Sequence, residues 1–163
     1  MREKVQKLMD SCRFGADYYP EHWPRERWET DAKLMKDMGL QVVRMAEFAW
    51  HKMEPEKGQF CFDWLDDAIA LLGSYGIVTI LGTPTAAPPA WLVEELPEVL
   101  PIDSQGQQKG FGGRHHDCQS NQAYRAHIRR LVRAMAEHFK DNPYVIGWQI
   151  DNELEANFCH CEI

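Results

Sequence analysis

The chain has 163 residues, of which 44% are hydrophobic and 26% charged, a balance typical of a folded domain rather than a disordered or fibrous protein. Acidic residues outnumber basic residues by 25 to 18, which gives a formal net charge of −7. This charge repels phosphate backbones and anionic lipid head groups, so we expect neither nucleic acid nor a membrane as a partner.

Targeting and membrane-spanning segments are also not expected. Residues 1–12 contain no apolar run, so they do not have the pattern of a signal peptide. The uncharged stretch 68–93 is long enough to cross a bilayer, but glycines and prolines interrupt it repeatedly. The five cysteines are an odd number without the spacing of a disulfide framework, which predicts a reducing, cytoplasmic location.

The first third of the chain predicts a strand, a helix and a second strand. A strand at 13–19 is followed by a helix that starts at Pro24, because proline is tolerated in the first helical turn, and that stops before Gly39. A second strand is expected at 40–48. The apolar positions that recur at helical spacing, and are therefore expected in the core, are Trp28, Ala32, Met35 and Met38.

The same alternation continues to the end of the sequence. A helix over 62–75 is expected to bury Leu65, Ala68, Ile69 and Leu72, and the apolar run 77–81 predicts a strand buried on both faces. An irregular segment from 82 to about 120, with a short helix near 89–96, leads to a helix over 121–140 and a fourth strand over 144–150. The last long helix has a polar face that is expected to be solvated and that carries Arg125, Arg129, Arg130 and Arg133.

Four strand–helix alternations predict an α/β fold with a parallel sheet, as in a doubly wound protein or a (β/α)8 TIM barrel. No Gly-x-Gly-x-x-Gly motif follows the first strand, which removes the simplest argument for a dinucleotide-binding fold. Polar residues follow the strands instead, and in a barrel these positions meet at the active-site face. We therefore expect about the first four β/α units of a barrel, since a whole barrel needs about 250 residues. These polar positions include Asp17, Glu47, Thr83, Asn152 and Glu153.

Residues 148–153 form the strongest candidate for chemistry. A carboxyl group such as that of Glu153, leaving a buried strand beside aromatic residues, can have a raised pKa and act as a general acid. The Asn152 amide can hydrogen-bond a substrate hydroxyl. From the residues alone, the same Asp-Asn-Glu sequence could also be a helix-capping turn.

Two further segments contain candidate ligands. Cys118, Cys159 and Cys161 are thiols of the kind that bind zinc, although the one-residue gap between the last two is tighter than usual. His160 is the obvious fourth ligand in isolation, but adjacent residues rarely both reach one ion. Free cysteine is the alternative for these three, and the expected state of Cys12 and Cys61. In residues 111–118, Arg114 offers a planar fork of donors, whereas His115 and His116 lack metal-ligand spacing and are expected to be structural or surface residues.

Five segments together resemble one family, the glycoside hydrolase family 42 β-galactosidases. They occur in family order and cover nearly all of the chain from Phe14 onward. The matching segments are GADYYPEHW (15–23), VRMAEFAW (43–50), LGTPTAAPPAWL (81–92), FGGRHHDC (111–118) and GWQIDNE (147–153).

This resemblance implies a (β/α)8 barrel that hydrolyses terminal β-D-galactosides with retention of configuration. It implies that Glu153 is the acid/base, that Asn152 and Arg114 bind the sugar, and that Cys118, Cys159 and Cys161 are three of four thiolates of a structural zinc site. Residues 1–163 would then be the N-terminal half of the catalytic barrel domain, truncated after strand 4. The family also suggests a homo-oligomer, often a trimer, for the complete protein.

The family's nucleophile and fourth zinc thiolate are expected beyond Ile163, so we predict negligible hydrolysis by these residues alone. Glu21 and Glu47 are poor substitutes for the nucleophile, because both belong to the matching motifs. Half a barrel would also expose strand edges and is expected to self-associate. The alternatives are a non-catalytic galactoside-binding module, a zinc-binding module and another retaining barrel glycosidase.

Overall fold

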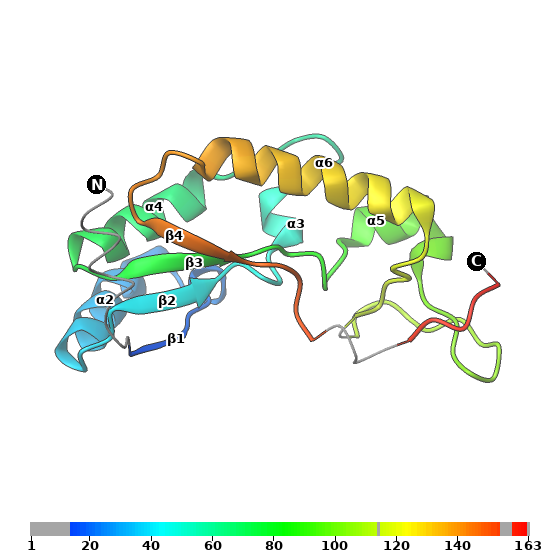
Figure 1. The fold of residues 1–163 in the computed structure, drawn as a ribbon, viewed down its shortest axis with the longest axis horizontal. Coiled ribbons are helices and arrows are strands. Elements are labelled where there is room, and N and C mark those ends of the chain that lie inside the picture. Colours follow the sequence, from blue (N-terminus) through cyan, green and yellow to red (C-terminus); the bar gives the residue numbers. More distant parts are fainter. Residues whose placement is uncertain (1–13, 114, 154–157, 163) are drawn as a thin grey trace.

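The computed structural model describes residues 14–113, 115–153 and 158–162, which form a four-stranded parallel sheet with helices between the strands (Figure 1). The strand order follows the sequence, β1-β2-β3-β4. The strands are β1 (Gly15–Asp17), β2 (Val42–Met45), β3 (Val78–Gly82) and β4 (Val145–Gln149). The α-helices are α2 (Trp28–Asp37), α3 (Trp50–Met53), α4 (Asp63–Ser74), α5 (Ala90–Glu95) and α6 (Gln122–Phe139). Short 3-10 turns complete the fold at η1 (Pro20–His22), η2 (Arg25–Arg27) and η3 (Pro97–Val99).

All three strand pairs are parallel, so the carboxyl ends of the strands share one edge of the sheet. Asp17 pairs with Arg44 in the β1–β2 register, and Gly82 pairs with Gln149 in the β3–β4 register. In Figure 1 the helices α2 and α4 lie behind the sheet, and α6 runs along its β4 side. This arrangement brings the segments that follow the four strands to the same end of the molecule.

The core lies between the sheet and its helices. The four apolar residues expected to face inward from 62–75 are all buried in α4, which confirms that prediction. Apolar β3 is buried at four of its five positions. Asn121 caps α6 with its side-chain oxygen, which accepts the backbone N–H of Tyr124 at 3.0 Å. The largest fully buried side chains include Trp50, Tyr124, Phe139, Leu65 and Leu131.

Several sequence predictions were wrong in detail. Met38, expected in the core, is 68% exposed, because α2 ends at Asp37 and Gly39 then takes a left-handed φ of +83°. Pro24 caps the 3-10 turn η2 instead of starting an α-helix. The helix α3 was not expected at all, because four residues give no usable periodicity.

Arg130 corrects the expectation of a fully solvated arginine face on α6. Its guanidinium forms an ion pair with Glu54, whose side chain is completely buried, and also lies 5.2 Å from the ring centre of Phe60. Glu54 accepts two further hydrogen bonds, from the Trp50 indole N–H at 3.0 Å and from the backbone N–H of Gly58 at 2.6 Å. Arg130 is therefore half-buried and pairs with a buried carboxylate, in contrast to a solvated arginine.

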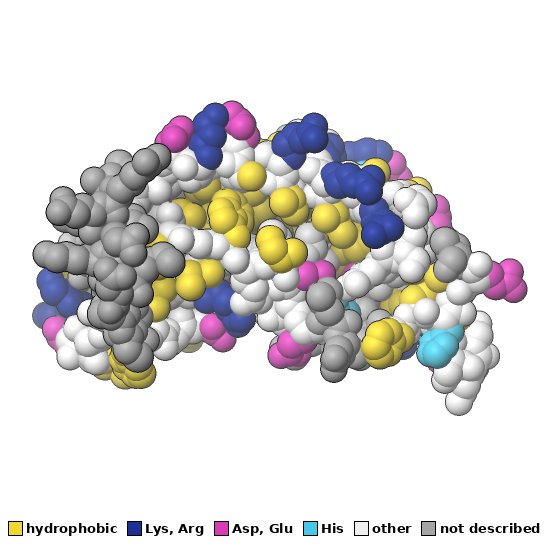
Figure 2. Space-filling model, viewed as in Figure 1, with side chains coloured by type: hydrophobic (Ala, Val, Ile, Leu, Met, Phe, Trp, Pro, Cys, Tyr) yellow, Lys and Arg dark blue, Asp and Glu magenta, His cyan; other side chains and the backbone are white. Residues whose placement is uncertain are grey.

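One face of the molecule presents apolar side chains along β4 and the adjoining flank of α6 (Figure 2). In β4, Trp148 is 37% exposed, and Ile150 directly after this strand is 74% exposed. Ile150 lines a cavity of about 480 Å³, together with Thr83, Ile128, Arg129 and Asp151, among others. Within the part of the chain that the structure describes, no helix is both long and apolar enough to cross a membrane.

Candidate active site

Arg44 links three strands at the carboxyl edge of the sheet. From β2, one of its terminal nitrogens lies 2.9 Å from a carboxylate oxygen of Asp17 and 2.9 Å from one of Glu47. The other donates to the Gln149 side-chain oxygen on β4 at 2.6 Å. Partial burial opposes the charge of Arg44, but the two carboxylates outweigh it and raise the pKa of the guanidinium.

Glu47 lies at the centre of this edge with a completely buried side chain. Its Oε1 accepts the Tyr19 hydroxyl at 2.8 Å, in addition to Arg44. Burial and the Glu47 carboxylate raise the pKa of Tyr19 to about 12. The neighbouring strand residue must be glycine, because a Cβ on Gly82 would lie 2.5 Å from the Glu47 Cβ. Glu47 is thus held in place by charge, hydrogen bonding and close packing.

The turn after β4 carries Asn152 and Glu153. The backbone N–H of Asp151 donates to Thr83 Oγ1 at 2.8 Å, which ties this turn to the segment after β3. Gln149 donates its side-chain amide to the Asp151 carbonyl at 2.8 Å and to Asn152 Oδ1 at 3.2 Å. Asn152 is buried and Glu153 is exposed, so an accessible carboxyl group follows directly after a fixed amide.

The segment 115–118 packs against this turn. His115 and His116 are both buried, and their Nε2 atoms contact the carbonyl oxygens of Asn152 and Pro88, respectively. These contacts match the structural role expected for both histidines. Asp117 is buried beside His115, and this burial raises the pKa of its carboxyl group to about 7, against the opposing effect of His115. Arg114, the predicted sugar-binding arginine, lies outside the described residues.

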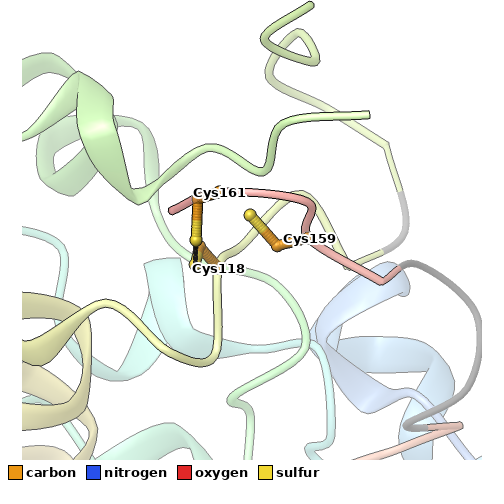
Figure 3. Close-up of side chains that lie close together, drawn as sticks. All are labelled: Cys118, Cys159 and Cys161. Carbon is orange, nitrogen blue, oxygen red and sulfur yellow. Dashed lines mark hydrogen bonds between the residues drawn. The ribbon is translucent and has the colours of Figure 1, made fainter. Parts of the chain in front are cut away.

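Three cysteines lie close together where residues 158–162 pass Cys118 (Figure 3). The sulfur atoms of Cys118, Cys159 and Cys161 all lie within 4.8 Å of one another, and those of Cys118 and Cys161 are 3.5 Å apart. Tetrahedral zinc with bonds of about 2.3 Å places its sulfur ligands about 3.8 Å apart, so these three thiols fit such an ion. Cys159 also accepts the Ile102 backbone N–H at 3.3 Å. Among the described residues, His160 is not part of this cluster, and its backbone N–H donates to the Ile102 carbonyl at 2.8 Å.

Ionisation of the cluster is uneven. Burial, followed by hydrogen bonding with the other two thiols, raises the pKa of Cys118 to about 12. Burial also opposes ionisation of Cys159, but hydrogen bonds from the backbone and from the neighbouring thiols outweigh it and lower its pKa. A bound cation would replace the thiol protons, because the metal ligand is the thiolate.

The sequence reasoning found the residues that follow the strands and missed those that support them. Arg44 was not singled out, although a charged residue within the apolar run Val42-Val43-Arg44-Met45 is a signal that could have identified it. Asp117 gave no such signal, because its burial depends on a fold contact between distant segments.

The sequence and fold of this chain are similar to those of known beta-galactosidases. The family model described as beta-galactosidase, glycoside hydrolase family 42, matches residues 17–163. The beta-galactosidase BgaA of Clostridium cellulovorans is 49% identical over 150 residues, which cover 92% of this chain and 23% of the relative. The beta-galactosidase of Thermus thermophilus is also 49% identical over 150 residues, which cover 90% of this chain and 23% of the relative. The chain thus spans about a quarter of the length of the curated relatives it matches.

Solved structures agree with the family match. The beta-galactosidase of Halorubrum lacusprofundi has a TM-score of 0.88 at 47% identity, covering 92% of this chain and 23% of that protein. The enzyme of Bacillus circulans sp. alkalophilus has a TM-score of 0.86 at 35% identity, covering 91% and 22%. A beta-glucosidase of Exiguobacterium marinum, at 20% identity and a TM-score of 0.58, shares the fold alone. The predicted α/β barrel class is confirmed, with this chain folded as its first four units.

Proposed function

The chain belongs to the glycoside hydrolase family 42 β-galactosidases, and from this premise we propose that it supplies the acid/base and sugar-binding residues for retaining hydrolysis of terminal β-D-galactosides. The observation that carries the proposal is the position of Glu153. This exposed carboxyl group follows β4 at the shared carboxyl edge of the sheet, directly after the buried amide of Asn152.

In the proposed first step, the Glu153 carboxyl protonates the glycosidic oxygen as its bond to the anomeric carbon breaks. A second carboxylate forms a new bond to the anomeric carbon and gives a covalent glycosyl–enzyme. In the second step, Glu153 takes a proton from water, which attacks the anomeric carbon and releases the carboxylate. Retention requires the two carboxyl groups to lie about 5–5.5 Å apart.

We propose that this second carboxylate comes from residues outside the present sequence. Glu47 is a poor nucleophile, because its side chain is fully buried and accepts bonds from Arg44 and Tyr19. Its proposed role is instead to hold Tyr19 and Arg44, and Arg44 in turn contacts Gln149 on β4. We likewise propose a homo-oligomeric state and a cytoplasmic location, on the resemblance and on the cysteine content, respectively.

Asn152 and Arg114 are proposed to bind the sugar. Asn152 Oδ1 accepts the Gln149 amide at 3.2 Å, so its amide nitrogen supplies the donor for a galactose hydroxyl. Arg114 is assigned to the same sugar by its place in the FGGRHHDC motif. A guanidinium suits this task, because its planar donors can contact two hydroxyl oxygens at once.

Cys118, Cys159 and Cys161 are proposed to hold a structural zinc ion, with a fourth ligand from outside this sequence. The support is the proximity of the three sulfur atoms and the chemistry of thiolate ligands. Bound zinc would join the segment that contains Cys118 to residues 158–162, which also contact Ile102 through two hydrogen bonds.

The proposal is tested with a hybrid enzyme, in which residues 14–163 of this chain replace the matching segment of the Clostridium cellulovorans BgaA. The hybrid should hydrolyse 4-nitrophenyl β-galactoside faster than the corresponding glucoside or mannoside. Glu153→Gln should lower kcat by about 10²–10⁴-fold, because general acid–base catalysis contributes that much. The matched control Glu94→Gln, on the exposed face of α5, should keep the activity. Full activity of Glu153→Gln would refute the assigned role.

A further inference from the structure

The turn that carries Glu153 has an unfavourable backbone conformation. Asp151 has a φ of +58° and Glu153 a φ of +51°, both in the left-handed region that residues with a Cβ seldom adopt. Such conformations persist only where the surroundings fix them, and they concentrate at functional sites. Groups that hold this turn therefore decide where the Glu153 carboxyl points.

Among the described residues, Thr83, Gln149 and His115 hold the backbone of the turn from outside it, in addition to the hydrogen bond from the Asn152 N–H to the Asp151 side chain at 2.7 Å. Thr83 accepts the Asp151 N–H, and Gln149 donates to the Asp151 carbonyl, each at 2.8 Å. The third is His115, whose Nε2 contacts the carbonyl oxygen of Asn152. Since a carbonyl oxygen can only accept, Nε2 carries the proton and donates it. The Asn152 carbonyl belongs to the peptide group that leads into Glu153, so His115 restrains the rotation that sets the φ of Glu153.

A backbone hydrogen bond and burial restrict His115 itself. Its backbone N–H donates to the Ala86 carbonyl in the segment after β3 at 3.2 Å. Its own φ is +50°, and its imidazole is 3% exposed. Its Nδ1 lies 3.6 Å from a carboxylate oxygen of buried Asp117, which is too far for a hydrogen bond, so Nε2 makes the directional contact of the ring. The imidazole is therefore buried in one orientation, with Nε2 directed at the Asn152 carbonyl oxygen.

We propose that His115 is a positioning residue for the acid/base: its Nε2–H, anchored on the Asn152 carbonyl, holds the left-handed turn that presents Glu153. This inference rests on the proposed function for its catalytic consequence. His115 directly follows Arg114 in the sequence, so the same residue connects the two segments proposed to bind the sugar.

The first test measures backbone hydrogen exchange in the full 163-residue chain and needs no activity. His115→Phe removes the donor but keeps a ring, whereas His115→Gln keeps an N–H near the position of Nε2. We expect backbone amide exchange in residues 149–153 to rise by at least about tenfold in His115→Phe. The reason is that the loosened turn breaks the hydrogen bond from the Asp151 N–H to Thr83 more often. It should stay within about threefold of wild type in His115→Gln and in the control His138→Phe, which changes an exposed position of α6. Unchanged protection in His115→Phe would overturn the inference.

The second test measures kinetics in the hybrid enzyme. Misplacing a catalytic group by about 1 Å can cost about 100-fold in rate, so His115→Phe should lower kcat by about 10–100-fold with KM changed by less than about threefold. His115→Gln should restore most of kcat. Equal loss in both variants would assign His115 a packing role only and contradict the proposal. If Glu153→Gln stays active while His115→Phe still loosens the turn, the proposed function fails and the positioning contact stands.

Discussion

Gly82→Ala tests the packing that fixes the carboxyl edge of the sheet. A Cβ at this position would lie 2.5 Å from the Cβ of Glu47, 2.9 Å from its Cα and 3.1 Å from its backbone nitrogen. Two of these three atoms are backbone, so a side-chain rotation cannot relieve the clash. Glu47 cannot shift freely either, because its carboxylate is bound to Arg44 and Tyr19. We expect the free energy of unfolding to fall by about 2–3 kcal/mol, the upper part of the range for overpacking a core.

The assay is urea unfolding of the chain, followed by tryptophan fluorescence at two protein concentrations so that self-association is recognised. Gly110→Ala is the matched control, because no atom lies within 4 Å of its added Cβ and its φ lies outside the left-handed region. The control should change the free energy of unfolding by less than about 0.5 kcal/mol. Gly82→Ala with wild-type stability would show that β2 and β3 are not packed as closely as this account requires.

Three further outcomes are expected. The chain should bind close to one equivalent of zinc, measured by elemental analysis. Cys118→Ser should lose most of this zinc, whereas the control Cys61→Ser, at an exposed cysteine outside the cluster, should keep it. Equal zinc content in both variants would contradict a zinc site at the three cysteines. Glu54→Ala should lower the free energy of unfolding by about 1–3 kcal/mol, because it leaves the buried Trp50 indole N–H without its acceptor and Arg130 without its ion-pair partner; a loss below about 0.5 kcal/mol in urea unfolding would show that these contacts add little to stability. Burial holds the pKa of Asp117 at about 7, above its usual 3.8, so the folded state binds more protons than the unfolded state between these pH values. The free energy of unfolding should therefore fall as the pH rises from 4 to 7. In metal-free protein, Asp117→Asn should flatten this pH dependence, and an unchanged slope would argue against the raised pKa.

Local patterns were sufficient to predict the type and order of the main elements. The apolar spacing of 62–75 predicted α4 and its four buried positions, because helical period and core contact coincide there. Positions after the strands predicted where Asp17, Glu47 and Thr83 would meet, since parallel strands align their carboxyl ends.

Long-range contacts account for what the sequence did not predict. Arg130 has the spacing of a solvated residue, and only the packing of α6 against buried Glu54 turns it inward. Met38 has helical spacing, but α2 ends before it and leaves it in solvent. The contact between His115 and the Asn152 carbonyl joins segments 37 residues apart, and no local pattern encodes it.

The role of Glu153 is tested most directly by rescue with azide. In the Glu153→Ala hybrid, the glycosyl–enzyme lacks the base that activates water, whereas azide needs no deprotonation to attack the anomeric carbon. Azide should therefore accelerate turnover of 4-nitrophenyl β-galactoside by Glu153→Ala, but not by the unmutated hybrid, and release β-galactosyl azide. Formation of the β-azide would establish Glu153 as the acid/base. Two results would contradict this role of Glu153. One is hydrolysis by Glu153→Ala at the rate of the unmutated hybrid, and the other is an active unmutated hybrid whose Glu153→Ala variant forms no galactosyl azide.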